Sequence, residues 1–177
     1  MKPPSGDKPD GPGALFTLPE TLKVSSDPGT RGAVLARGSG ETPDEHPQTL
    51  TSLNNMGVLL RAQGKLAEAE PYLREALAGF TKRLGPARWE TAKCEADLGT
   101  VLRDLSRYGK AEAHLLKAES VLGAAQGLPP GKYRGCVEET IKLYEKWDAA
   151  EPGQGHAEQA AGWRAKLTAQ PEFDEPK

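Results

Sequence analysis

Apolar residues recur three or four positions apart over residues 46–169, which is the spacing of one face of an α-helix. Leu53, Met56 and Leu60 predict the buried face of a first helix, and Gly64 predicts the turn that ends it. A second helix is predicted by Leu66, Ala69, Leu73, Ala76, Leu77 and Phe80. The Gly-Pro pair that follows favours a helix end, because Gly accepts a left-handed cap and Pro cannot continue a helix. The pattern therefore predicts a helical hairpin.

This hairpin pattern repeats without a gap at a fixed sequence separation of 42 residues, as between Met56 and Leu98. We call this separation the repeat offset. Identical or similar pairs at this offset are Thr49/Thr91, Met56/Leu98, Gly57/Gly99, Leu60/Leu102, Arg61/Arg103, Ala69/Ala111, Leu73/Leu115 and Ala76/Ala118. Self-similarity of this kind is typical of a solenoid rather than of a single globular core. Small residues within the pattern indicate helices that approach each other closely.

A third unit is predicted over residues 131–169, with weaker similarity. Ile141 stands where the first two units have Gly57 and Gly99, and the turn carries an insertion of seven residues. The second helix of this unit is expected to begin at about His156. A degenerate last unit is what a terminal cap should look like, because one of its faces has no following neighbour.

The residues Gly57, Ala69, Leu73 and Ala76 have spacings similar to the tetratricopeptide signature. The standard unit has about 34 residues, whereas the unit here has 42, a length that is also compatible with HEAT or armadillo repeats. The long unit resembles the tetratricopeptide repeats of kinesin light chains and their bacterial relatives. The resemblance implies an all-α, right-handed superhelical solenoid of three tetratricopeptide-type helical hairpins, and it says nothing about residues 1–45, for which composition predicts a disordered N-terminal arm.

The chain is expected to divide into three zones. Residues 1–45 contain seven Pro and seven Gly, a level typical of disordered segments, and the apolar runs at 15–18 and 33–36 are too short to bury a face alone. The expected boundaries are a disordered arm at 1–45, a repeat domain at 46–169 with units at 46–87, 88–130 and 131–169, and a polar tail at 170–177.

Composition narrows the expected partners. The formal net charge is -2, from 23 Lys and Arg against 25 Asp and Glu, so no basic surplus supports binding to a nucleic acid. No apolar run reaches the roughly 18 residues that a transmembrane helix requires, and the first residues do not resemble an export signal. We therefore expect a cytoplasmic protein that binds neither nucleic acid nor membrane.

No motif for catalysis or for metal binding is convincing. The string from Gly127 to Lys132 resembles a phosphate loop but lacks both the first Gly and the final Ser or Thr of that motif. Cys94 and Cys136 are separated by one repeat offset, with no second pair, so they are interpreted as buried small hydrophobes. We expect no enzyme activity, no cofactor, no metal and no small-molecule substrate.

The tetratricopeptide resemblance implies that a peptide lies along the first helices of the units. The side chains expected to face it are Asn54, Asn55, Val58, Arg61, Lys93, Ala96, Asp97, Thr100 and Arg103. Asn54 and Asn55 match the paired asparagines of the long-unit family, whereas the second unit has Ala96 and Asp97 in their place.

Two interpretations of the arginines remain open. Arg61 and Arg103 occupy equivalent positions and could present forked donors to an acidic peptide. In the other interpretation, Asp97 and Asp104 neutralise Arg103 in structural ion pairs.

The sequence thus predicts a protein-interaction module, an adaptor or scaffold that binds a peptide segment of another protein. The alternative is a non-catalytic regulatory or C-terminal remnant of a larger bacterial signalling protein, such as a repeat-bearing serine/threonine kinase.

Overall fold

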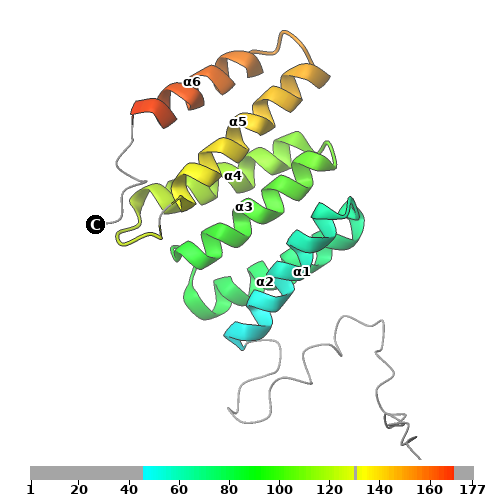
Figure 1. The fold of residues 1–177 in the computed structure, drawn as a ribbon, viewed down its shortest axis with the longest axis vertical. Helices are drawn as coiled ribbons and strands as arrows, with labels where there is room; N and C mark the ends of the chain where they lie inside the picture. Colours follow the sequence, from blue (N-terminus) through cyan, green and yellow to red (C-terminus); the bar gives the residue numbers. More distant parts are fainter. Residues whose placement is uncertain (1–45, 130, 170–177) are drawn as a thin grey trace, which may run out of the picture. The chain divides into compact units, whose positions relative to one another are not determined.

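The computed structural model describes residues 46–129 and 131–169, and these ranges form six α-helices (Figure 1). The helices are α1 (Pro47–Ala62), α2 (Leu66–Leu84), α3 (Trp89–Asp104), α4 (Tyr108–Ala124), α5 (Lys132–Ala150) and α6 (His156–Ala169). They pack in chain order as three antiparallel hairpins, α1–α2, α3–α4 and α5–α6. The predicted all-α architecture is confirmed, whereas the predicted arm and tail lie outside the described residues.

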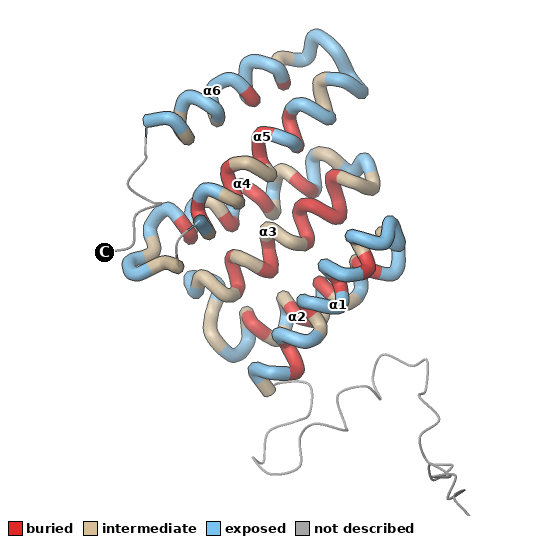
Figure 2. Tube along the Cα trace, in the orientation of Figure 1, coloured by how far each residue is buried: buried red, intermediate tan, exposed pale blue. Residues whose placement is uncertain are grey.

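The first helices α1, α3 and α5 follow one another along one side, and α2 and α4 lie behind them in Figure 1. α3 contacts both α1 and α5, and each second helix contacts the first helix of the next hairpin. We call the surface formed by α1, α3 and α5 the first-helix face. Because α3 lies in the middle of this arrangement, it is the helix with the most buried residues (Figure 2).

Equivalent residues form the turns of the first two hairpins. Gly64 ends the first turn with a φ of 75°, a conformation that costs Gly little because it has no Cβ. Ser106, which lies one repeat offset later, adopts the same left-handed conformation with a φ of 59°. The repeat offset therefore governs the backbone path and not only the apolar pattern.

A glycine in each of the first two hairpins lets the two helices approach closely. A Cβ added to Gly57 would lie 2.5 Å from Leu73 Cγ, and one added to Gly99 would lie 2.8 Å from Leu115 Cγ. Leu73 and Leu115 are fully buried, as are the alanines one turn before them in the second helices. The predicted close contact at these small residues is thus present in both hairpins.

The expected burial of Met56 is wrong. Met56 is 43% exposed, whereas its equivalent Leu98 is fully buried. Leu98 packs in a core cluster with Leu73, which belongs to the second helix of the preceding hairpin. No hairpin precedes α1 in the described part of the chain, so the same helix face has no cover there.

Aromatic stacking closes the third hairpin, which lacks the glycine. Ile141 stands in its place, and α6 begins at His156 as expected. The ring of His156 stacks on Trp147 with 4.0 Å between centroids, and the Tyr144 ring lies 6.5 Å from Trp147 and 6.3 Å from His156. The wide insertion in the turn is therefore bridged by ring contacts between the end of α5 and the start of α6.

The close contact at Gly57 predicts the direction in which Gly57→Ala changes stability, because tight packing and helix propensity have opposite effects there. Gly→Ala in an exposed helix interior normally stabilises by about 0.8–1 kcal/mol. At Gly57 the added methyl would displace Leu73, and overpacking costs about 1–3 kcal/mol. We expect Gly57→Ala to lower the free energy of unfolding measured by urea titration.

Gly109 in α4 provides the matched control, because a Cβ added there meets nothing within 4 Å. Gly109→Ala should leave stability unchanged or raise it. A stabilising effect of Gly57→Ala would contradict the packing described for the first hairpin.

Candidate functional site

Polar side chains connect α1 to α3 across the first-helix face. Asn54 donates from Nδ2 to Asp97 Oδ2 at 2.9 Å, and Lys93 donates to the same oxygen at 2.6 Å. Asn54 is only 5% exposed, and its Oδ1 is buried without a hydrogen-bond partner in the described residues. Its side chain therefore belongs to the interface between two hairpins, whereas its neighbour Asn55 is exposed.

The two predicted arginines take part in an ion-pair network rather than facing solvent as a pair. Arg61 Nε lies 2.8 Å from Asp104 Oδ2, which ties α1 to α3. Arg103 is 5% exposed, with Nε 3.1 Å from Asp104 Oδ1 and Nη1 2.6 Å from Glu139 Oε2 in α5. Lys146 of α5 adds a contact to Asp104 at 3.2 Å.

The network shifts the titration of Asp104. Burial by itself would raise the pKa of this carboxyl, but hydrogen bonds from Arg103 and Arg61 outweigh burial and lower the pKa from 3.8 to about 2. The pKa of Glu139 is also lowered, because bonds from Lys142 and Arg103 outweigh its burial. Both carboxylates therefore stay charged near neutral pH and hold the arginines in place.

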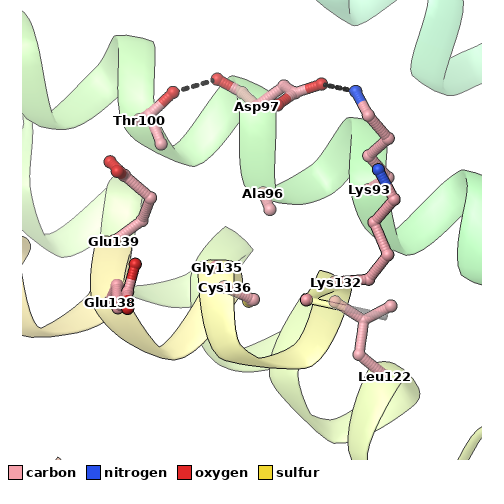
Figure 3. A pocket seen from close by; sticks show the side chains of 11 residues that line it. Lys93, Ala96, Asp97, Thr100, Leu122, Lys132, Gly135, Cys136, Glu138 and Glu139 are labelled. Carbon is pink, nitrogen blue, oxygen red and sulfur yellow. Dashed lines mark hydrogen bonds and ion pairs between the residues drawn. The ribbon is translucent and has the colours of Figure 1, made fainter. Parts of the chain in front are cut away.

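A pocket of about 280 Å³ opens between α3 and α5 (Figure 3). Four predicted side chains, all on α3, line it: Lys93, Ala96, Asp97 and Thr100. Thr100 is nearly buried, and its hydroxyl donates to the backbone oxygen of Asp97 at 2.7 Å. Of the other predicted residues, Asn54, Asn55, Val58, Arg61 and Arg103 do not line this pocket.

The opposite wall of the pocket comes from α5 and was not predicted. It consists of Gly131, which caps α5, and of Lys132, Gly135, Cys136, Glu138 and Glu139, and Leu122 of α4 completes the lining. The repeat pattern could have identified three of these residues, because Gly135, Glu138 and Glu139 lie one repeat offset after Lys93, Ala96 and Asp97. Extending the predicted set to the degenerate third unit would have found them.

Charge is distributed unevenly around the pocket. At one end Lys132 extends towards Lys93, whose amine is directed at Asp97, and Glu138 and Glu139 lie at the other end (Figure 3). Lys93 is paired with Asp97, whereas Lys132 forms no ion pair with any described residue. Gly135 keeps the space open, since a Cβ added there would meet nothing within 4 Å.

Both cysteines are buried and free, and each thiol points to a carbonyl of the preceding second helix, from Cys94 to Leu73 and from Cys136 to Leu115. Burial raises the pKa of each thiol to about 12. Among the described residues, no group of three or more His, Cys, Asp or Glu is arranged to hold a metal ion. No helix of residues 46–129 and 131–169 is long and apolar enough to cross a membrane.

Comparisons with known proteins identify a matching family model and a similar solved structure. Residues 48–123 match the model described as tetratricopeptide repeat. The structure is similar to that of BtubC (BKLC) from P. vanneervenii, with a TM-score of 0.57 at 18% identity. The match covers 76% of this chain and 53% of that chain, so this chain spans about half the length of BtubC. No curated protein matches the sequence.

The Asp104 network predicts a pH-dependent contribution to stability. The folded-state pKa of about 2 lies below the ordinary 3.8, so the contribution is complete above pH 3.8 and disappears as the pH falls towards 2. The shift corresponds to about 1–3 kcal/mol. We expect Asp104→Asn to lower the free energy of unfolding by this amount near neutral pH, and the difference from wild type to shrink on acidification.

Glu138→Gln is the control, because Glu138 forms an exposed pair with Arg134 at 3.0 Å. Pairs of this kind contribute about 0–1 kcal/mol. Equal losses from the two variants in urea titrations near neutral pH would contradict a special role of the network.

The burial of Cys94 and Cys136 predicts low thiol reactivity, since the thiolate is the reactive form. With a pKa of about 12, neither should be alkylated by iodoacetamide at about pH 8 in the folded protein. Mass spectrometry should detect both adducts only after unfolding in guanidinium. Rapid modification of the native protein would show that these core positions open readily.

Proposed function

We propose that this chain, a tetratricopeptide repeat protein by the match of residues 48–123, binds a peptide segment of another protein in the pocket between α3 and α5. The resemblance to tetratricopeptide repeats of the long-unit, kinesin-light-chain-like type and the predicted solenoid fold are confirmed. Tetratricopeptide repeats act in general as protein–protein interaction modules. The peptide, its place on the first-helix face and the absence of a catalytic role are our proposals.

The pocket between Gly135 and Lys93 carries this proposal. Its volume of about 280 Å³ lies just below the range of about 300–1,000 Å³ that drug-sized ligands occupy. It therefore suits one or two side chains of an extended peptide better than a whole small molecule. Ala96, Cys136 and Leu122 offer apolar surface for an aliphatic side chain.

The charged groups favour a peptide that also carries a carboxylate. Lys132 has no ion-pair partner in the described residues, and it lies beside Lys93 at one end of the pocket (Figure 3). A carboxylate bound there would gain a charge-assisted hydrogen bond. At the other end, Glu138 and Glu139 are already paired with Arg134 and Arg103, so Lys132 is the group that we assign to the carboxylate.

The predicted binding of an acidic peptide by Arg61 and Arg103 has weaker support than the pocket. Arg61 and Arg103 already donate to Asp104 and Glu139, so an acidic peptide would have to replace bonds within the protein. Desolvating such pairs and leaving one partner unpaired is costly. We therefore assign these arginines to the support of the first-helix face and Lys132 to the peptide.

Gly135→Leu tests the proposal by filling the pocket. The new side chain enters open space, and leucine is a better helix former than glycine by up to about 1 kcal/mol. We expect the variant to melt at or above the wild-type temperature but to lose peptide binding. Peptides selected from a random display library on the wild-type protein should bind the variant with a Kd raised about tenfold or more, equal to at least about 1.4 kcal/mol.

Gly162→Leu in α6 is the matched control, because it makes the same change at a helical glycine that also faces open space and does not line the pocket. It should bind the selected peptides like the wild type. If the library yields no binder, or if Gly135→Leu retains full affinity, binding at this pocket is ruled out.

A further inference from the structure

Three large apolar side chains stand exposed in the described residues, and all belong to α1: Met56, Val58 and Leu59. Met56 and Leu59 are separated by one helical turn, so they share a face, with Ser52 one turn before Met56. We call Ser52, Met56 and Leu59 the open edge of α1. Met56 is 43% exposed and Leu59 is 52% exposed.

The later hairpins show what covers this face when a hairpin precedes it. The equivalents of Met56 and Leu59 in α3 are Leu98 and Val101, and both are fully buried. They pack in one cluster with Leu73 of α2. The equivalent of Leu59 in α5, Leu143, is also fully buried.

Ala76 of α2 gives the position of this cover in more detail. It shares a core cluster with Phe80 and Cys94, and Cys94 is the equivalent of Ser52 on the open edge. The element that covers this face of α3 is therefore the second helix of the preceding hairpin, at its alanine- and leucine-containing middle.

The sequence before α1 contains a matching apolar segment at the repeat distance. Ala33-Val34-Leu35-Ala36 lies one repeat offset before Glu75-Ala76-Leu77-Ala78. Ala36 precedes the first residue of α1 by the same number of residues that separates Ala78 from the first residue of α3. The chain therefore places this segment at the correct distance to cover the open edge.

We propose that residues 33–36 dock on the open edge of α1, in the way that the middle of α2 covers α3. Val34 would lie over Ser52, and Leu35 would shield Met56 and Leu59 from water. The residues between 36 and 47 are long enough to cross one helix width, since an extended chain spans about 3.3 Å per residue. For these four residues, the proposal replaces the expectation of a disordered arm.

A tethered segment is favoured over a second copy of the chain. Stable interfaces bury about 800 Å² on each partner, which far exceeds what a few side chains on one helix can supply. A segment joined to α1 by a short linker instead has an effective concentration in the millimolar range. Weak apolar contacts are therefore sufficient for it to dock.

Disulfide trapping in the full chain tests this placement directly. Val34→Cys with Ser52→Cys reproduces the pair equivalent to Ala76 and Cys94, which belong to one buried cluster. Val34→Cys with Thr51→Cys is the matched control, with the same tether but a side chain turned to another face of α1. The native cysteines are buried and need no replacement.

Under mild oxidation, we expect the Ser52 pair to form an intramolecular disulfide faster than the Thr51 pair, as read on non-reducing gels and by mass spectrometry. Equal rates in the two pairs would overturn the docking. Disulfide-linked dimers as the main product of the Ser52 pair would also overturn it, because they would identify a second copy as the occupant.

Thermal melting of a double-mutant cycle gives a second, independent readout. Leu35→Asp should lower the Tm of the wild-type chain but not that of Met56→Ser/Leu59→Ser, where the apolar partners are absent. Leu15→Asp places the same charge elsewhere in the arm and should leave the Tm unchanged. A Leu35→Asp variant that melts like the wild type would contradict the proposal.

Discussion

The close approach of two helices at a glycine is the constraint on which the structure depends. Gly57 leaves room for Leu73, and Gly99 leaves room for Leu115 at the equivalent place in the next hairpin. Because both hairpins close in the same way, equivalent residues of the first helices come to lie beside one another in successive hairpins. The leucines of the core and the polar pairs of the first-helix face both follow from that register.

The polar pairs show how this register acts on side chains. Asn54 reaches Asp97 and Arg61 reaches Asp104, each across 43 residues, and Lys146 reaches Asp104 across 42. The network joins three hairpins and agrees with the second of the two interpretations that the sequence left open for Arg61 and Arg103, in which Asp104 neutralises Arg103 in a structural ion pair. Lys132, by contrast, forms no ion pair within the described part of the protein, which is why our proposal assigns the peptide carboxylate to it.

The repeat offset was sufficient to predict the hairpins, the turn positions and the close contacts, because these depend on local spacing and on the absence of side chains at fixed positions. It was insufficient for Met56, whose burial depends on whether another hairpin precedes α1. It was also insufficient for Arg103, since Asp104 and Glu139 both lie within reach and only the packed rotamers select the bonds formed. The burial of His156 depends on an insertion that no repeat rule describes.

The pocket follows from two substitutions between equivalent junctions. Where α3 meets α5, Gly135 and Leu122 contribute to the lining. Their equivalents beside α1 are Lys93 and Phe80, which are both larger, and Lys93 shares Asp97 with Asn54. At the first junction, Phe80 packs in a buried cluster with Leu50 of α1. The second junction keeps an open space bordered by Lys132, which has no ion pair among the described residues. The absence of a side chain at Gly135 in the degenerate last unit thus leaves a space on the first-helix face, and this space is where we propose that a peptide side chain binds.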